Sequence, residues 1–126
     1  SLGGSGTILY STLAKRCDMV ISFVPFLHIA PKITSKTCYR FSKRIEHLSN
    51  IEIPSFIPYL NNTTKYNIVY GTGNPCDEYQ LKLVPSKHNV KVIRTKYNTH
   101  GITEQMKKNN ELNQFIINTI KNGIDK

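Results

Sequence analysis

Three polar features of this chain have the residue types needed for nucleophilic chemistry on a carbonyl group. Ser1 opens the segment SLGG at residues 1–4, Asp77 and Glu78 follow a strand-like run, and His100 stands before a glycine in a polar loop. A serine hydroxyl becomes a nucleophile when a histidine takes its proton, and a carboxylate orients that histidine. In chain order the features are a serine, an acid and a histidine.

The residues beside Ser1 suit a tight turn into a helix. A strained turn of this kind leaves no room for Cβ atoms, so Gly3 and Gly4 fit the position. The N-terminus of a helix also stabilises negative charge that develops nearby. The segment therefore predicts that Ser1 stands at a glycine-flanked start of a helix.

The elements that must position these residues begin with one helix and one strand. Residues 3–17 place apolar side chains on one side of a helix and end in Lys15 and Arg16, which favour the helix dipole. These apolar side chains are Ile8, Leu9, Leu13 and Ala14. Residues 19–24 form a continuous apolar run of strand length closed by Pro25, which predicts a strand buried on both faces.

The rest of the chain alternates strands and helices. Strands are predicted over 66–70 and 89–95, and helices over 37–48, 77–83 and 111–121, the last capped by Gly123. Residues 30–65 have the weakest pattern, with loops around Pro54 and Pro58. The alternation predicts an α/β three-layer sandwich with about three parallel strands flanked by helices. Because ligands gather at the carboxyl ends of such strands, the three polar features should share one edge of the sheet.

The motifs resemble the C-terminal half of the α/β-hydrolase superfamily. Residues 1–4 are similar to the second half of its G-x-S-x-G-G elbow, without the leading glycine. The segment GTGNPCD at 71–77 resembles the acid loop, and YNTHG at 97–101 resembles the histidine loop. A narrower likeness is to bacterial esterase-like hydrolases associated with surface polysaccharide.

The resemblance implies a role for each residue. Ser1 would attack a carbonyl, His100 would take and return the proton, Asp77 would orient His100, and the backbone N–H of Leu2 would donate to the oxyanion. No metal or organic cofactor is implied. Residues 1–126 would be the C-terminal portion of a single domain, a fragment that lacks the N-terminal half with its early strands and one oxyanion-hole loop.

The acid position has three candidates. Asp77 suits the role, although aspartate is also a good cap for the helix that it would start. A G-x-x-D-P acid loop would place the acid at Asn74, where this chain has an amide, and Glu78 is a further carboxylate. Because an amide cannot compensate the charge of an imidazolium, the residues favour Asp77.

These roles predict serine hydrolysis of a carboxylic ester, or acyl transfer through an acyl-enzyme, on a small-molecule or glycan ester. With one oxyanion donor, these 126 residues alone should show little or no esterase activity. The alternative is a non-catalytic interaction or secretion-accessory protein on a degenerate α/β-hydrolase fold, which Asn74 keeps open. The edge of the sheet beside the first strand should expose Ile21 and Val24 and favour self-association.

Composition excludes several other classes of protein. Seventeen Lys and Arg against eight Asp and Glu give a net charge of +9, but the bases are scattered, so no nucleic-acid partner is predicted. No apolar run is long enough for a membrane span. Three cysteines without metal-ligand spacing predict free thiols in a reducing, cytoplasmic setting. His28, at the end of the first strand, would lie near the same edge, whereas His47, His88 and Cys76 receive no role.

Overall fold

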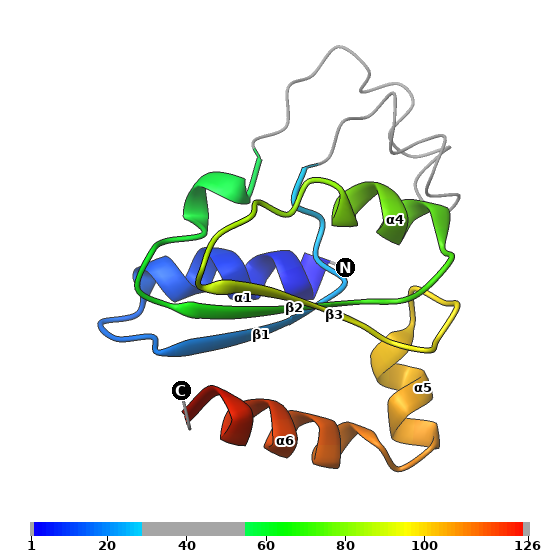
Figure 1. The fold of residues 1–126 in the computed structure, drawn as a ribbon. Helices are drawn as coiled ribbons and strands as arrows, with labels where there is room; N and C mark the ends of the chain where they lie inside the picture. The colour runs from blue at the N-terminus through cyan, green and yellow to red at the C-terminus, as the bar shows by residue number, and fades with distance from the viewer. Residues whose placement is uncertain (1, 29–54, 125–126) are drawn as a thin grey trace.

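A computed structural model describes residues 2–28 and 55–124 of the chain. In chain order the elements are helix α1 (Leu2–Leu13), strand β1 (Met19–Phe23), the 3-10 helix η2 (Ile57–Tyr59), β2 (Lys65–Tyr70), α4 (Pro75–Leu81), β3 (Val90–Arg94), α5 (Ile102–Lys108) and α6 (Leu112–Ile124) (Figure 1). The helix predicted over 37–48 lies outside the described residues.

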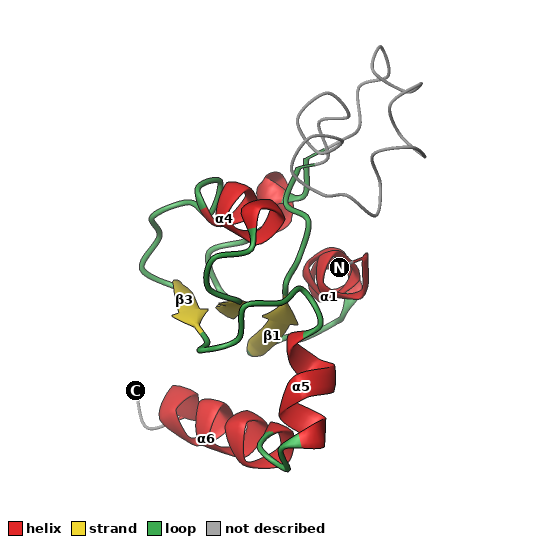
Figure 2. Cartoon of the chain, turned by 90° about the vertical axis from the view of Figure 1, so that its right-hand side faces the viewer, coloured by secondary structure: helices red, strands yellow, loops and turns green. Residues whose placement is uncertain are grey.

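The three strands form an open parallel sheet in the order β1-β2-β3. Met19 of β1 pairs with Lys65, and Tyr66 of β2 pairs with Val90. Figure 2 shows α1 and α4 on one side of the sheet and α6 on the other, which makes three layers. The predicted α/β class is therefore confirmed for the described part of the chain, with three parallel strands.

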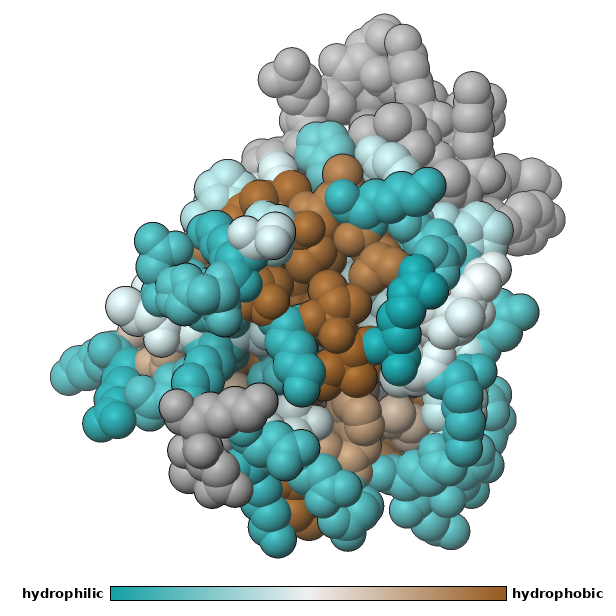
Figure 3. All heavy atoms as spheres, in the orientation of Figure 1, coloured by the Kyte–Doolittle hydropathy of each residue, from teal (hydrophilic) through white to brown (hydrophobic). Residues whose placement is uncertain are grey.

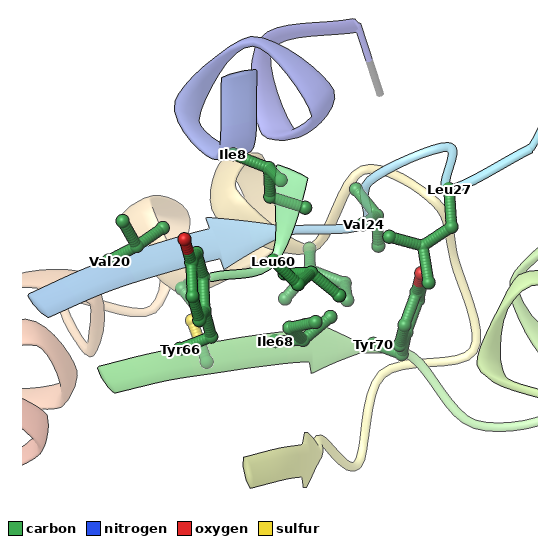
Figure 4. Close-up of a cluster of buried hydrophobic side chains, with 10 residues drawn as sticks. Ile8, Val20, Val24, Leu27, Leu60, Tyr66, Ile68 and Tyr70 are labelled. Carbon is green, nitrogen blue, oxygen red and sulfur yellow. The ribbon is translucent and has the colours of Figure 1, made fainter. Parts of the chain in front are cut away.

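The core lies between the central strand and the layer that contains α1. Every residue of β2 after Lys65 is buried, because helices cover both faces of a parallel sheet. Figure 4 shows the main cluster, in which side chains from β1, β2, α1 and two loops meet. Its labelled members are Ile8, Val20, Val24, Leu27, Leu60, Tyr66, Ile68 and Tyr70.

Helix α1 differs from the prediction. It ends at Leu13, so Lys15 and Arg16 lie beyond it, and the Leu13 side chain is 70% exposed. The side of α1 that faces the sheet carries Ile8 together with small residues, among them Gly4, Ser5 and Ser11, all of them buried. Small residues let the helix approach the sheet closely. The buried side of α1 is therefore not marked by apolar periodicity, and the prediction that Leu13 and Ala14 lie on that side is wrong because both are exposed.

The C-terminal quarter also differs from the prediction. Helix α5 occupies residues for which the sequence predicted no element, and it buries Ile102 and Met106 one turn apart. A turn with Asn110 at a φ of 57° separates α5 from α6. Gly123 lies inside α6 and does not cap it, because the helix continues to Ile124. Seven residues with two apolar positions carry too weak a periodic signal to predict α5.

Within the described residues, β1 and β3 are the outer strands of the sheet. Val24 is only 4% exposed, so the prediction that it adds apolar surface at the edge is wrong. Val92 of β3 is 37% exposed instead, and Figure 3 shows apolar side chains gathered over β3 below α4. None of the helices in the described ranges combines the length and the apolar character that a bilayer crossing requires.

Candidate active site

The acid loop leads from β2 into α4 and buries one carboxylate. Asn74 caps α4, and its side-chain oxygen accepts hydrogen bonds from the backbone N–H groups of Cys76 and Asp77 at 3.0 and 3.3 Å. Asp77 follows in the first turn of the helix and is 1% exposed. The cap fixes the start of α4, and the start of α4 fixes the direction of the Asp77 carboxylate.

The histidine loop runs beside the acid loop. The N–H of Thr72 donates to the carbonyl of Tyr97 at 2.9 Å, and its hydroxyl donates to the carbonyl of Thr95 at 2.6 Å. A Cβ on Gly71 would stand 2.7 Å from the Tyr97 carbonyl oxygen and 3.0 Å from that of Thr99. Only glycine leaves room for this approach, which brings His100 towards α4.

His100 and Asp77 form the central pair of the site. The distance between Nδ1 of His100 and Oδ1 of Asp77 is 2.7 Å, with the His100 side chain 20% exposed and that of Asp77 1% exposed. A carboxylate accepts hydrogen bonds, so this contact places a proton on Nδ1 and leaves Nε2 of a neutral ring as an acceptor. Oδ2 of Asp77 is buried and has no hydrogen-bond partner among the described residues.

The structure separates the three candidates for the acid position. Asn74 is occupied as the cap of α4. Glu78 accepts from the N–H of Gly73 at 3.2 Å and from the guanidinium of Arg94 at 2.7 Å. These contacts, chiefly the hydrogen bond from the Gly73 N–H, lower the pKa of Glu78. They bind the Glu78 carboxylate to its own loop and to Arg94. Asp77 is the candidate that contacts His100, as the residue types favoured, while its catalytic role stays a prediction.

Tyr70 is a neutral donor beside the acid loop. Its ring is fully buried, and its hydroxyl donates to the carbonyl of Pro25 at 2.8 Å. Burial, and after it the negative charge of Asp77, raises the pKa of Tyr70 far above its ordinary value. Tyr70 therefore stays protonated and holds the segment after β1 against the end of β2.

The first turn of α1 lies at the same edge of the sheet. A Cβ on Gly4 would stand 2.3 Å from the carbonyl oxygen of Phe23, the last residue of β1, and Ser22 donates to the Gly4 carbonyl at 2.7 Å. Figure 2 looks onto this edge and shows the N-terminus of α1 facing the viewer. Leu2 is the first residue of α1, and the first N–H groups of a helix have no partner within it. Ser1 lies outside the described residues.

One aromatic residue connects α1 to the histidine. The Phe26 ring centroid lies 5.6 Å from that of His100. Its backbone N–H donates to Ser5 of α1 at 2.9 Å, and the Ser5 hydroxyl contacts its carbonyl at 2.9 Å. Val24, with an unusual φ of 44°, turns the chain sharply between β1 and Phe26. The helix that carries Leu2 and the ring of His100 are therefore joined through one buried residue.

Sequence reasoning missed Phe26 and also Gln80. Gln80 lies one turn after Asp77 on α4 and is 1% exposed. Its carboxamide accepts from the N–H of Leu27 at 2.7 Å and donates to the carbonyl of His28 at 2.8 Å. The spacing of Asp77 and Gln80 on one helix face is the only sequence signal for this contact. His28 is thus tied to the same edge through its backbone, as expected, whereas His47 lies outside the described residues.

Comparison with known proteins adds no relative. The chain matches no protein-family model, and searches of curated proteins and of solved structures find no similar protein. Residues 2–28 and 55–124 hold no group of three His, Cys, Asp or Glu side chains placed to bind a metal ion. The function must therefore be inferred from the geometry of the site.

Proposed function

We propose that the chain carries the catalytic residues of a serine hydrolase that acts on a carboxylic ester, or transfers its acyl group, through an acyl-enzyme. The observation that supports this most is the 2.7 Å contact between His100 and the buried Asp77. The start of α1, which Ser1 precedes, lies at the same edge of the sheet. A small-molecule or glycan ester is the proposed substrate class.

In the proposed reaction the Ser1 oxygen forms a bond to the ester carbonyl carbon while Nε2 of His100 takes the hydroxyl proton. The backbone N–H of Leu2 donates to the oxyanion that develops. The carbon–oxygen bond to the alcohol then breaks, and His100 returns the proton to the departing oxygen. Water, or an acceptor alcohol, then attacks the acyl carbon while His100 takes its proton, the bond from that carbon to the Ser1 oxygen breaks, and His100 returns the proton to Ser1.

Asp77 would act by stabilising the charged ring of His100. The carboxylate is buried, and charges interact more strongly where water is excluded. The hydrogen bond to Nδ1 also keeps the ring in the tautomer that leaves Nε2 free to accept a proton. Removal of this carboxylate should therefore slow the reaction more than removal of an exposed acid.

Labelling with a fluorophosphonate tests the proposal directly. The reagent forms a covalent bond to an activated serine and releases fluoride, and mass spectrometry locates the modified peptide. We expect modification at Ser1, lost in Ser1→Ala and His100→Ala and slowed by about 10²-fold or more in Asp77→Asn. His88→Ala, which changes an exposed histidine outside the site, should label as the unchanged protein does.

Two results would contradict the proposal. Labelling at Ser1 that persists in His100→Ala would show that Ser1 reacts without His100 as its base. Labelling needs one covalent event rather than repeated turnover, so a single oxyanion donor should slow it without abolishing it. No labelling even after prolonged exposure would favour the non-catalytic alternative. That alternative depended on Asn74 at an acid-like position, and the amide there has a structural role as the cap of α4.

A further inference from the structure

A cavity lies at the edge of the sheet opposite to the candidate active site. Its volume is about 440 Å³, and residues from the start of β2, the start of β3 and the last turns of α6 line it. In Figure 1 the C-terminal end of α6 lies below the start of β2, away from the end of the sheet at which α1 begins. Cavities of roughly 300–1,000 Å³ commonly hold small molecules.

Asn67 is the most informative residue of this cavity. It lies on the central strand β2 among buried residues, lines the cavity and is 9% exposed. Within residues 2–28 and 55–124 no side chain or backbone group forms a hydrogen bond with its carboxamide. The carboxamide faces the cavity and is not sealed in the core, so water or a ligand in the cavity must supply its hydrogen bonds. A ligand with a donor and an acceptor would take the place of that water.

The charged side chains that line the cavity, among the residues that the structure describes, are basic or neutral. Lys65, Lys91 and His88 line it, and no aspartate or glutamate of residues 2–28 and 55–124 does. Nζ of Lys65 donates to the neutral carbonyl of Gly123 at 2.6 Å, and neither Lys91 nor His88 forms an ion pair in the described part of the chain. Within the described ranges, the lining therefore offers positive charge without an acidic partner, which favours an anion.

The remaining lining residues add neutral hydrogen-bonding groups beside the apolar surface of the cavity. Asn62, Thr63 and Asn122 carry amide or hydroxyl groups, and Ile93 provides an aliphatic wall. Amides and hydroxyls match the donors and acceptors of a hydroxylated molecule. A wholly apolar ligand would leave these groups, and the amide of Asn67, without partners.

We propose that this cavity binds a small organic anion that carries hydroxyl groups. The ammonium groups of Lys91 and Lys65 would face the anionic group, and the carboxamide of Asn67 would bond a hydroxyl inside the cavity. The proposal is independent of the serine-hydrolase proposal, because none of Leu2, Asp77 and His100 lines the cavity.

Titration followed by amide NMR signals tests this with defined probes at constant ionic strength. Glucuronate and glucose 6-phosphate carry an anion and hydroxyls, glucose lacks the anion, and inorganic phosphate lacks the hydroxylated ring. We expect one of the first two to shift the signals of Asn67, Lys91 and Thr119 saturably at concentrations on the order of 10 mM. Glucose and inorganic phosphate should bind at least about tenfold more weakly.

Substitutions locate the binding and control for net charge. Asn67→Leu and Lys91→Gln should each weaken the binding of the organic anion by about tenfold. Lys107→Gln, which removes the same charge from an exposed position on α5, should change its affinity less than about twofold. Because the Asn67 amide has no partner, Asn67→Leu should melt at the same temperature as the unchanged protein or higher.

Each other outcome would overturn the proposal. If neither organic anion shifts the signals saturably, the cavity is not such a site. Equal binding of inorganic phosphate would show a site for bare anions, and equal effects of Lys91→Gln and Lys107→Gln would show attraction by net charge alone. A clearly lower melting temperature for Asn67→Leu would assign the amide a structural role, and concentration-dependent broadening without a probe would indicate that a second copy covers the cavity.

Discussion

Replacing Gly4 by alanine should open the candidate site by moving α1 away from β1. The new Cβ would stand 2.3 Å from the carbonyl oxygen of Phe23 and 3.0 Å from the backbone nitrogen of Pro25. Both are backbone atoms, so no side-chain rotation can relieve the contact. The helix must shift, and the hydrogen bond from Ser22 to the Gly4 carbonyl must lengthen.

Gly6 provides a matched control on the same helix. Among the described residues, a Cβ there would meet only the Tyr10 ring, at 3.9 Å. Alanine in a helix is more stable than glycine by about 0.5–1 kcal/mol, and this gain applies at both positions. At Gly4 it is opposed by about 1–3 kcal/mol for overpacking and about 1 kcal/mol for the weakened hydrogen bond. We expect Gly4→Ala to be less stable than Gly6→Ala by about 2–4 kcal/mol.

Urea denaturation of the two variants measures this difference in the free energy of unfolding. The NMR signal of the His100 ring provides a second readout, since Phe26 joins that ring to α1. We expect it to move in Gly4→Ala and to stay in place in Gly6→Ala. A Gly4→Ala variant as stable as Gly6→Ala, with an unchanged His100 signal, would refute the close approach of α1 to β1.

Three smaller perturbations test the loops of the site, each by urea denaturation. Asn74→Ala should lower the free energy of unfolding by about 1 kcal/mol, because it removes the cap of α4; no change would mean that the cap contributes nothing. Tyr70→Phe should cost about 1–3 kcal/mol by leaving the buried carbonyl of Pro25 without its donor, and a neutral result would contradict that bond. The pKa of Glu78 is lowered in the folded state. The stabilisation that the charged carboxylate gives is therefore complete above the ordinary glutamate pKa, and it is lost as the pH falls through the lowered pKa. The stability difference between the protein and Glu78→Gln should therefore shrink in acid, while a difference independent of pH would show that the charge of Glu78, paired with Arg94, is not involved.

The strands and the pairing of acid and histidine could be predicted from the sequence. Apolar runs mark β1 and β2 because a parallel strand covered on both faces has few polar positions. Once the strands are parallel, residues that follow them must lie at one edge, and this rule is enough to bring Asp77 near His100. Asp77 could be preferred to Asn74 because only a carboxylate compensates the charge of an imidazolium. The cap of α4, for which Asp77 was also suited, is Asn74.

The supporting contacts could not be predicted in the same way. Phe26 reaches His100 because the chain turns at Val24, a β-branched residue with a positive φ that sequence preferences disfavour. Gln80 binds the backbone of residues 27 and 28, and such contacts leave no pattern in the sequence of the segment that is bound. The extent of α1 was missed because its buried side is made of small residues, which hydrophobic periodicity does not register.

The order of the strands in the sheet has a consequence for the folding kinetics. The central strand β2 pairs with β3 across a short connection through α4, whereas its pairing with β1 joins residues about twice as far apart in the sequence. Each doubling of a loop costs about 0.6 kcal/mol in closure entropy, so the β2–α4–β3 unit should form first. This unit contains Asp77 and ends just before His100. The acid and the base would then meet early in folding, and the docking of α1 would complete the site as a later step.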